Sequence, residues 1–401
     1  MLLYPPMRKL PTLSLSVLLW VTVFQVTVPV VNGQNGDDSD IDKHIQEVFP
    51  TPPGTQSTTT DNCSCVPFYR CNNSTINTDG TGLIDIRFNS GPCDNYLEKC
   101  CVDPLTNNPI QESKNPKAFN CGQWNSGGVG FRITGNYQSE AQFGEFPWMV
   151  AILRQDNIAN KITYLCGASL IHPKVVMTAV HCIHDKTPGE LIIRAGEWDT
   201  QTENELFPFQ DGRVAKIVKH EKYYGGAVHN DVALIFLTEP FHLTDNVGTV
   251  CLPPRNFQFN REKCYVSGWG KDIFGKDGVH QVILKRIDLK MVPDDICQDQ
   301  LRQTRLGPKF QLHESFICAG GEVGKDACKG DGGSPLVCPT PEHPEQFHQS
   351  GIVAWGIGCG EKTPGVYVDV SHFRLWIDQQ MINHGYDTTY YDAYYTPPMG
   401  N

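Results

Sequence analysis

The chain is predicted to be an all-β protein that carries a small, disulfide-linked module ahead of its main domain. From Ile133 to about Gly385, short apolar runs such as "WMVAIL", "LIIRAG", "VALIFL", "CYVSGWG" and "GIVAWG" alternate with turn residues, which is typical of an antiparallel sandwich or barrel. The sequence also has 37 glycines and 28 prolines, which suits the many turns of such a fold. Six of the 16 cysteines gather upstream of this region, within residues 63–101.

Residues 1–33 are predicted to be a secretory signal peptide. Arg8 and Lys9 precede an apolar run from Leu10 to Val31, and the small residue Gly33 closes it as a plausible cleavage position. The run is long enough that an uncleaved membrane anchor is the alternative. Two prolines within it and the polar sequence that follows favour cleavage. We therefore expect a secreted protein, and no later run is suited to span a membrane.

Charge and composition exclude some classes of function. The formal net charge is −11 and no block of basic residues is present, so binding to nucleic acid is not expected. Residues 34–60 are acidic and then rich in Pro, Ser and Thr, which predicts a flexible lead-in that cannot form a core.

Residues 61–103 form the cysteine-rich module. Such a short segment cannot bury a large core and depends on disulfides. Zinc is the alternative role for its cysteines, but none of them pairs with histidine at metal-ligand spacing. Adjacent cysteines are not expected to bond to each other, because that bond strains the backbone. Sequons for N-glycosylation begin at Asn62, Asn72 and Asn73.

The remaining segments flank the β-rich domain, which we place at residues 133–385. Residues 104–132 are predicted to be a linker. The stretch "SHFRLWIDQQMINHG" has apolar residues at helical spacing and ends at Gly385, so it predicts a C-terminal helix. Residues 386–401 are tyrosine-rich and are expected to be a solvated tail.

Three segments suggest the chemistry of the main domain. "MTAVHC" contains His181, "HNDVALI" contains Asp231, and "CKGDGGSPLVC" has Gly332 at its centre. Together with "GEFPWMVAI", "CGASLI" and "GVYVDV", in this order, they resemble the chymotrypsin-like serine proteases over about 250 residues. The resemblance implies two perpendicular six-stranded β-barrels with the active site between them.

The resemblance also implies a triad that lacks its nucleophile. His181 and Asp231 match the histidine that takes the serine proton and the aspartate that orients it. Gly332 stands where the serine belongs, and a glycine cannot form an acyl-enzyme. Ser334 is no substitute, because two residues span roughly 6–7 Å, and a displacement of about 1 Å already costs on the order of 100-fold in rate. We expect no functional catalytic residue and no cofactor for catalysis.

Other family positions match residue by residue. Asp326, Gly356 and Gly365 match the pocket that receives Arg or Lys in trypsin-like members. Arg132 and Ile133 flank the candidate activation cleavage, with a cut elsewhere in the linker or the small module as the alternative. The resemblance implies that Asp331 pairs with the ammonium group that such a cut would free.

Disulfides and a metal are implied in the same way. "GEWDTQTENE" resembles a calcium loop, with Glu197 and Glu205 as ligands, and an acidic surface turn is the alternative. In the main domain and linker the implied disulfides are Cys121–Cys251, Cys166–Cys182, Cys264–Cys338, Cys297–Cys318 and Cys328–Cys359.

The spacing of the six upstream cysteines resembles the clip domain of arthropod proteases. That resemblance implies the disulfides Cys63–Cys100, Cys65–Cys93 and Cys71–Cys101. A clip domain followed by a protease domain with glycine for serine resembles the clip-domain serine protease homologues, which act as non-catalytic cofactors of prophenoloxidase activation in melanisation, an innate immune response.

The resemblance implies that an upstream clip-domain protease cleaves the chain in haemolymph. The product would then assemble into a homo-oligomer and assist the formation of phenoloxidase. An adhesion or microbial-pattern recognition protein is one alternative, and a residual trypsin-like peptidase is the other.

Overall fold

The structure is a computed structural model of the chain. It describes residues 63–67, 70–71, 83–85, 93, 97–102, 120–130, 132–134, 139–156, 161–202, 205–259, 262–271, 280–323, 331–340, 343–358 and 362–393. The signal sequence, the lead-in and the three sequons lie outside these ranges, as do Asp326, Cys328 and Cys359. Within these ranges, none of the helices has the length and apolarity that a bilayer crossing requires.

The prediction of two six-stranded barrels is confirmed. The first barrel closes in the order β10-β7-β6-β5-β8-β9. Apolar strands alternate with turns along the chain, as the sequence pattern predicted. A wholly buried strand such as β10 ("ALIFL") has apolar side chains on both of its faces. The strand bounds are β5 Met149–Asp156, β6 Lys161–His172, β7 Val175–Thr178, β8 Leu191–Ala195, β9 Gln210–Lys219 and β10 Ala233–Leu237.

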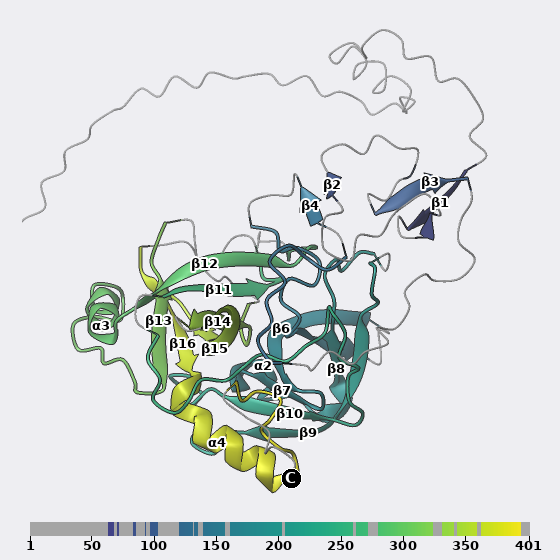
Figure 1. Ribbon diagram of the computed structural model, residues 1–401. Helices are drawn as coiled ribbons and strands as arrows, with labels where there is room; N and C mark the ends of the chain where they lie inside the picture. Colours follow the sequence, from purple (N-terminus) through teal and green to yellow (C-terminus); the bar gives the residue numbers. More distant parts are fainter. Residues whose placement is uncertain are drawn as a thin grey trace, which may run out of the picture. The chain divides into compact units, whose positions relative to one another are not determined.

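The second barrel closes in the order β11-β12-β13-β16-β15-β14. It lies beside the first, so that β14 and β6 face each other where the two barrels meet (Figure 1). The strand bounds are β11 Lys263–Gly268, β12 Lys285–Val292, β13 Phe316–Gly320, β14 Pro335–Thr340, β15 His343–Trp355 and β16 Pro364–Asp369. Strand pairing in both barrels is antiparallel, and the closure of each sheet removes exposed strand edges.

In the part of the chain that the structure describes, helices are few, as expected of an all-β protein. They are α2 Val180–Ile183, the 3-10 helix η2 Pro188–Glu190, α3 Asp294–Arg302 and α4 Val370–Asn383. The predicted C-terminal helix is α4, whose N-cap Asp369 accepts a hydrogen bond from the Ser371 amide. Phe373, Ile377 and Met381 form its buried face. The chain leaves the helix at Gly385, whose φ of +79° favours glycine.

Disulfides hold the upstream module and attach the linker. Within the module, β1 (Ser64–Pro67) pairs antiparallel with β3 (Glu98–Cys101). A further module strand, β2 (Leu83–Asp85), pairs parallel with β4 (Arg132–Thr134), which lies where the linker meets the main domain. The structure has seven of the eight disulfides that the family resemblance implied, and the eighth, Cys328–Cys359, lies outside the described residues. The seven pairs are Cys63–Cys100, Cys65–Cys93, Cys71–Cys101, Cys121–Cys251, Cys166–Cys182, Cys264–Cys338 and Cys297–Cys318.

The expectation of a solvated tail is wrong for residues 386–393, which pack on the main domain. The Tyr391 side chain is 0% exposed and its hydroxyl donates to Asp378 at 2.8 Å. The Tyr391 carbonyl accepts from the Leu252 amide at 2.9 Å. The tyrosine rings pack apolar surface against the domain, and this contact stabilises the segment. The polar residues beside the tyrosines led to the expectation of a solvated tail.

Candidate functional site

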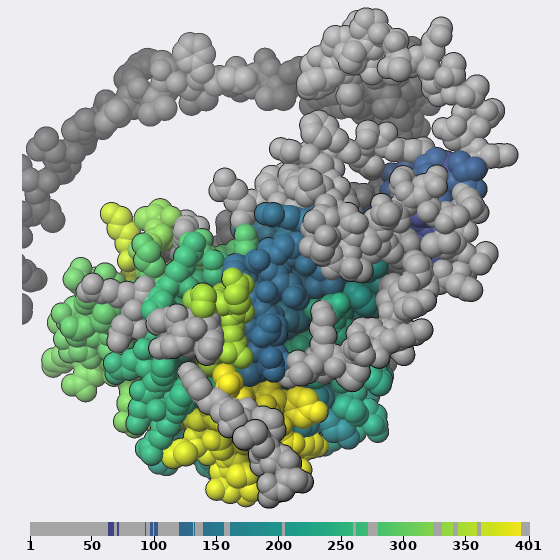
Figure 2. Space-filling view, viewed as in Figure 1, coloured from purple at the N-terminus to yellow at the C-terminus, as the bar shows by residue number. Residues whose placement is uncertain are grey.

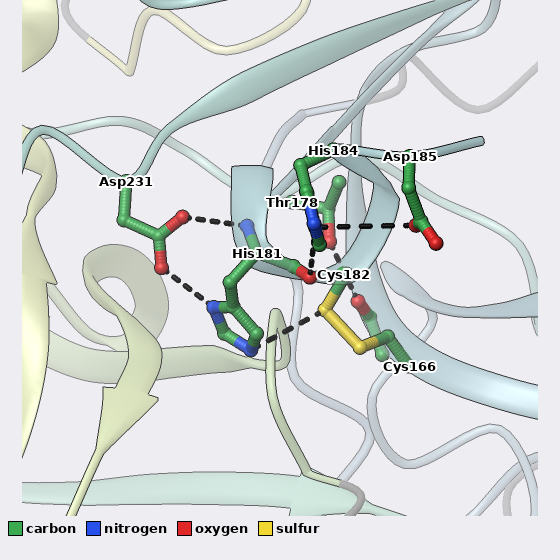
Figure 3. Close-up of a disulfide and its surroundings, with 8 residues drawn as sticks. Cys166, Thr178, His181, Cys182, His184, Asp185 and Asp231 are labelled. Carbon is green, nitrogen blue, oxygen red and sulfur yellow. Dashed lines mark hydrogen bonds and ion pairs between the residues drawn. A yellow bond between two sulfur atoms is a disulfide. The ribbon is translucent and has the colours of Figure 1, made fainter. Parts of the chain in front are cut away.

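The structure brings His181 and Asp231 together at the junction of the two barrels. His181 lies in α2, directly after β7, and Asp231 precedes β10. The Asp231 side chain is 0% exposed. One of its oxygens accepts from the His181 amide at 2.8 Å and the other contacts the ring Nδ1 at 2.6 Å. Figure 3 shows both contacts. This is the arrangement that orients a catalytic base in a serine protease.

Among the described residues, no hydroxyl group bonds to the other ring nitrogen of His181. Its Nε2 lies 3.6 Å from Cys182 Sγ, which belongs to the disulfide with Cys166 (Figure 3). Gly332 lies at the position from which a nucleophile would approach. A Cβ built on Gly332 would stand 2.6 Å from His181 Nε2, closer than real Cβ atoms come to other atoms. The imidazole thus occupies part of the space that a serine side chain needs.

The segment around Gly332 is firmly held between the barrels. The Gly332 carbonyl accepts from the Gly167 amide of β6 at 3.0 Å. Gly333 has a φ of +77°, and a Cβ there would collide with Thr178 and with the Gly167 carbonyl. The turn therefore depends on glycine at position 333, and the family-like geometry persists without the serine.

Ser334 is not placed to act in its stead. It is 0% exposed, and its hydroxyl lies against Gly167 and Gly268. In the described part of the chain it makes no hydrogen bond with His181. The base and the remaining serine therefore do not form a nucleophile pair.

Asp331 is bonded inside the second barrel while the bond between Arg132 and Ile133 is intact. One Asp331 oxygen accepts from the Gly270 amide at 2.9 Å. The neighbouring Tyr164 hydroxyl is buried, and burial together with the Asp331 charge raises its pKa well above the usual value. Arg132 is exposed and lies in β4, extended as a protease requires of its substrate. The Arg132 side chain is therefore accessible, but the backbone of β4 is paired with β2 (Leu83–Asp85).

The predicted pocket for Arg or Lys is described only in part, because Asp326 lies outside the described residues. Gly365 pairs with Ala319 in the sheet formed by β16 and β13. At Gly356, a Cβ would meet only the Gly358 carbonyl oxygen, at 3.7 Å, an ordinary contact. Space alone thus does not require glycine at position 356.

The two predicted calcium ligands are buried but differ in their partners. One Glu197 oxygen accepts from Arg194 at 3.0 Å, and the other accepts from the Trp198 amide at 3.0 Å. Burial, together with the charges of Glu197 and Asp199, raises the pKa of Glu205 to about 8. Because Arg194 already neutralises Glu197, the described residues do not form a calcium cage, and calcium stays a prediction.

Among the described residues, one group of three side chains has metal-ligand atoms close together. It consists of Cys166, His181 and Cys182. The two sulfurs are joined in a disulfide, so they are not available as thiolate ligands. This group therefore offers no metal site in the oxidised protein.

Comparison with known proteins agrees with this geometry. The family model described as Trypsin matches residues 136–377, which is more than half of the chain. The chain belongs to the trypsin family. A second model, described as Serine protease Clip domain PPAF-2, matches residues 51–102. The chain is therefore a clip-domain member of this family.

Three relatives illustrate its place within the family. Phenoloxidase-activating factor 2 of Galleria mellonella is 52% identical over 298 residues, which cover 72% of this chain and 97% of that protein. Inactive CLIP domain-containing serine protease A28 of Anopheles gambiae is 34% identical over 399 residues, 94% of this chain and 99% of that protein. Inactive CLIP domain-containing serine protease A8 of Anopheles gambiae is 36% identical over 323 residues, 78% of this chain and 87% of that protein.

The sequence pointed to the residues at this site but not to how they crowd one another. The close approach of His181 Nε2 to the position of a residue 332 side chain depends on the orientation of one ring, which the sequence does not predict. The disulfide behind the ring, Cys166–Cys182, was implied by the resemblance to the serine proteases, and the structure confirms it.

Proposed function

We propose that this protein is a secreted, non-catalytic clip-domain serine protease homologue that acts as a cofactor in prophenoloxidase activation. The proposal rests on one observation above all: the residue facing the oriented imidazole of His181 is Gly332, which has no atom that can attack a carbonyl. The relatives named phenoloxidase-activating factor and inactive protease favour the same function.

In this function, an upstream clip-domain protease cleaves the chain in haemolymph. Cleavage after Arg132 is consistent with the exposure of this side chain and with its extended backbone. The cut protein then contributes binding surface rather than chemistry, alone or as a homo-oligomer, and increases the yield of phenoloxidase that an active protease produces from its proenzyme.

The test is a reconstitution with purified prophenoloxidase and its activating protease, with and without this chain. The matched control is Arg132→Gln, which removes the predicted cleavage site at an exposed position. We expect the parent chain to increase phenoloxidase activity and the variant to stay uncut and inactive as a cofactor. N-terminal sequencing of the cut form identifies the cleaved bond.

Two results would overturn the proposal. An unchanged phenoloxidase yield, combined with tight binding of the chain to peptidoglycan or β-glucan, would favour a recognition protein. Covalent labelling of the cut protein by a fluorophosphonate probe, lost in His181→Ala, would show a working nucleophile and a residual peptidase.

A further inference from the structure

A concave site lies at the start of the C-terminal helix. It is a cavity of about 330 Å³, and we call its lining residues the histidine pocket. Figure 2 shows α4 and the residues that follow it (yellow) at the surface of the protein. The histidine pocket is lined by His220, Lys222, Asn230, His313, Glu314, His372, Phe373, Leu375 and Trp376.

Three imidazoles from distant parts of the sequence meet in the histidine pocket. His220 follows β9, His313 precedes β13, and His372 lies in the first turn of α4. A fourth histidine, His229, stacks on His313 with ring centroids 4.0 Å apart and planes 15° apart. Three histidines that line one small cavity, with a fourth stacked on one of them, are a concentrated group of titratable side chains in a chain that has 13 histidines in all.

We propose that the histidine pocket binds an oxyanion, such as a sulfate or phosphate group, when its histidines are protonated.

The charges around the rings determine the class of ligand. When the imidazoles are neutral, the positive charge of Lys222 and the negative charge of Glu314 offset each other. Glu221 adds a negative charge beside Trp376, from whose indole N–H it accepts a hydrogen bond at 3.0 Å. Protonation of the lining histidines reverses the sign of the pocket. The titratable and charged groups that face these rings are His220, Glu221, Lys222, His229, His313, Glu314, Asp369 and His372.

His220 and His229 resist protonation in the folded protein, because the pKa of each imidazole is lowered. Burial lowers the pKa of His220, and the nearby Lys222 and His372 lower it further, against the opposing effect of Glu221. Burial and His313 likewise lower the pKa of His229. An oxyanion between these rings offsets their mutual repulsion and accepts hydrogen bonds from protonated nitrogens. Binding the anion and taking up protons are therefore linked.

A metal ion is the competing ligand for several histidines, and the described geometry disfavours it. The ligand nitrogens of three of these rings do not lie within 4.8 Å of one another in the described part of the chain. The Lys222 ammonium lines the same pocket and repels a cation. The pocket also has apolar side chains that can contact the organic part of an anionic ligand. Leu375 is 54% exposed, and the rings of Trp376 and Phe373 each have their centroid 5.0 Å from the centroid of the His220 ring.

The test measures sulfate binding to the full-length protein by calorimetry and by thermal unfolding, at about pH 5.5 and about pH 7.5, on either side of the ordinary histidine pKa. Sulfate keeps the same charge across this range, so a change in affinity reports on the protein. We expect affinity to fall by about tenfold or more over this range, as uptake of at least one proton requires.

The variants separate the histidine pocket from the rest of the surface. The double variant His313→Gln with His372→Gln should lose most sulfate binding at the lower pH. Because His313 also stacks on His229, a second variant, Lys222→Gln, changes an exposed side chain and should weaken binding at both pH values. The matched control is His242→Gln, which removes an exposed histidine outside the pocket and should leave binding unchanged.

The source of the oxyanion is distinguished by a second ligand. If a heparin-derived disaccharide binds at least tenfold more tightly than sulfate, the pocket takes a sulfated sugar; equal affinity indicates a free anion, and both results support the site. The proposal is overturned by sulfate binding that is independent of pH or unchanged in both pocket variants, or by zinc binding at about pH 7.5 that the double variant abolishes.

Discussion

Restoring the missing nucleophile is the sharpest test of how the site is built. The change is Gly332→Ser in the cleaved protein, alone and together with Ser334→Gly, which rebuilds the family segment. Loss of the nucleophile costs about 10⁶ in turnover in a serine protease. A hydroxyl at position 332 recovers that factor only if His181 can hydrogen-bond with it in the productive geometry.

The structure sets the expected shortfall. A Cβ at position 332 stands 2.6 Å from His181 Nε2, so the ring must retreat by about 0.8 Å to reach the 3.4 Å of an ordinary contact. Asp231 holds the ring at Nδ1 at 2.6 Å and holds the His181 amide at 2.8 Å, which opposes that movement. Because misplacement by about 1 Å costs on the order of 100-fold, we expect the variant to gain activity yet stay about 100-fold below a working protease.

The assay combines fluorophosphonate labelling with hydrolysis of peptide substrates that have Arg or Lys before the cut bond. Gly332→Ala is the matched control, because it adds the same Cβ without a hydroxyl. Both variants should lose about 1–3 kcal/mol of stability from crowding against His181, and only the serine variant should be labelled. Full protease activity in Gly332→Ser, or no loss of stability in Gly332→Ala, would refute the crowding argument.

Three further predictions follow from the same contacts. Because the pKa of Glu205 is raised from 4.5 to about 8 in the folded state, its contribution to stability is full below pH 4.5 and is lost as the pH rises through 8. Denaturation measured from pH 4 to 9 should show the free energy of unfolding falling by at most about 5 kcal/mol, and this fall should be absent in Glu205→Gln. Calcium that binds at Glu205 should restore the lost stability at high pH. After cleavage in the linker at Arg132, the disulfide Cys121–Cys251 should keep the two fragments together, so electrophoresis should separate them only after reduction. Tyr391→Phe removes the hydrogen bond to Asp378 and should cost about 1–2 kcal/mol in denaturant unfolding, whereas the exposed Tyr224→Phe should cost little.

The strands could be predicted from the sequence because the evidence for each of them is local. Runs such as "VALIFL" and "LIIRAG" are each one strand long and are bounded by turn residues, so strand content is visible in a single stretch. The closure of each barrel and the disulfides came instead from resemblance to a family, because pairing between distant residues cannot be read from spacing alone.

The features that the sequence did not predict depend on packing between distant segments. Tyr391 is buried because it meets Asp378 on α4 and Leu252 after the first barrel, and none of these residues is its neighbour in sequence. The histidine pocket unites His220 with His313 and His372, separated by more than 50 residues at each step. Composition alone indicates a polar tail and histidines that are scattered along the chain, and neither indicates these contacts.

The preserved pair of His181 and Asp231 does not argue for catalysis. A fully buried carboxylate is costly unless its oxygens accept hydrogen bonds, and here the oxygens of Asp231 accept from the amide and the ring of His181. Replacing either side chain would leave a buried polar group without its partner. The pair therefore stabilises the junction between α2 and the segment before β10 whether or not a nucleophile is present. Gly332 offers no side-chain atom for attack on a carbonyl, so the function proposed above relies on binding by this scaffold rather than on chemistry.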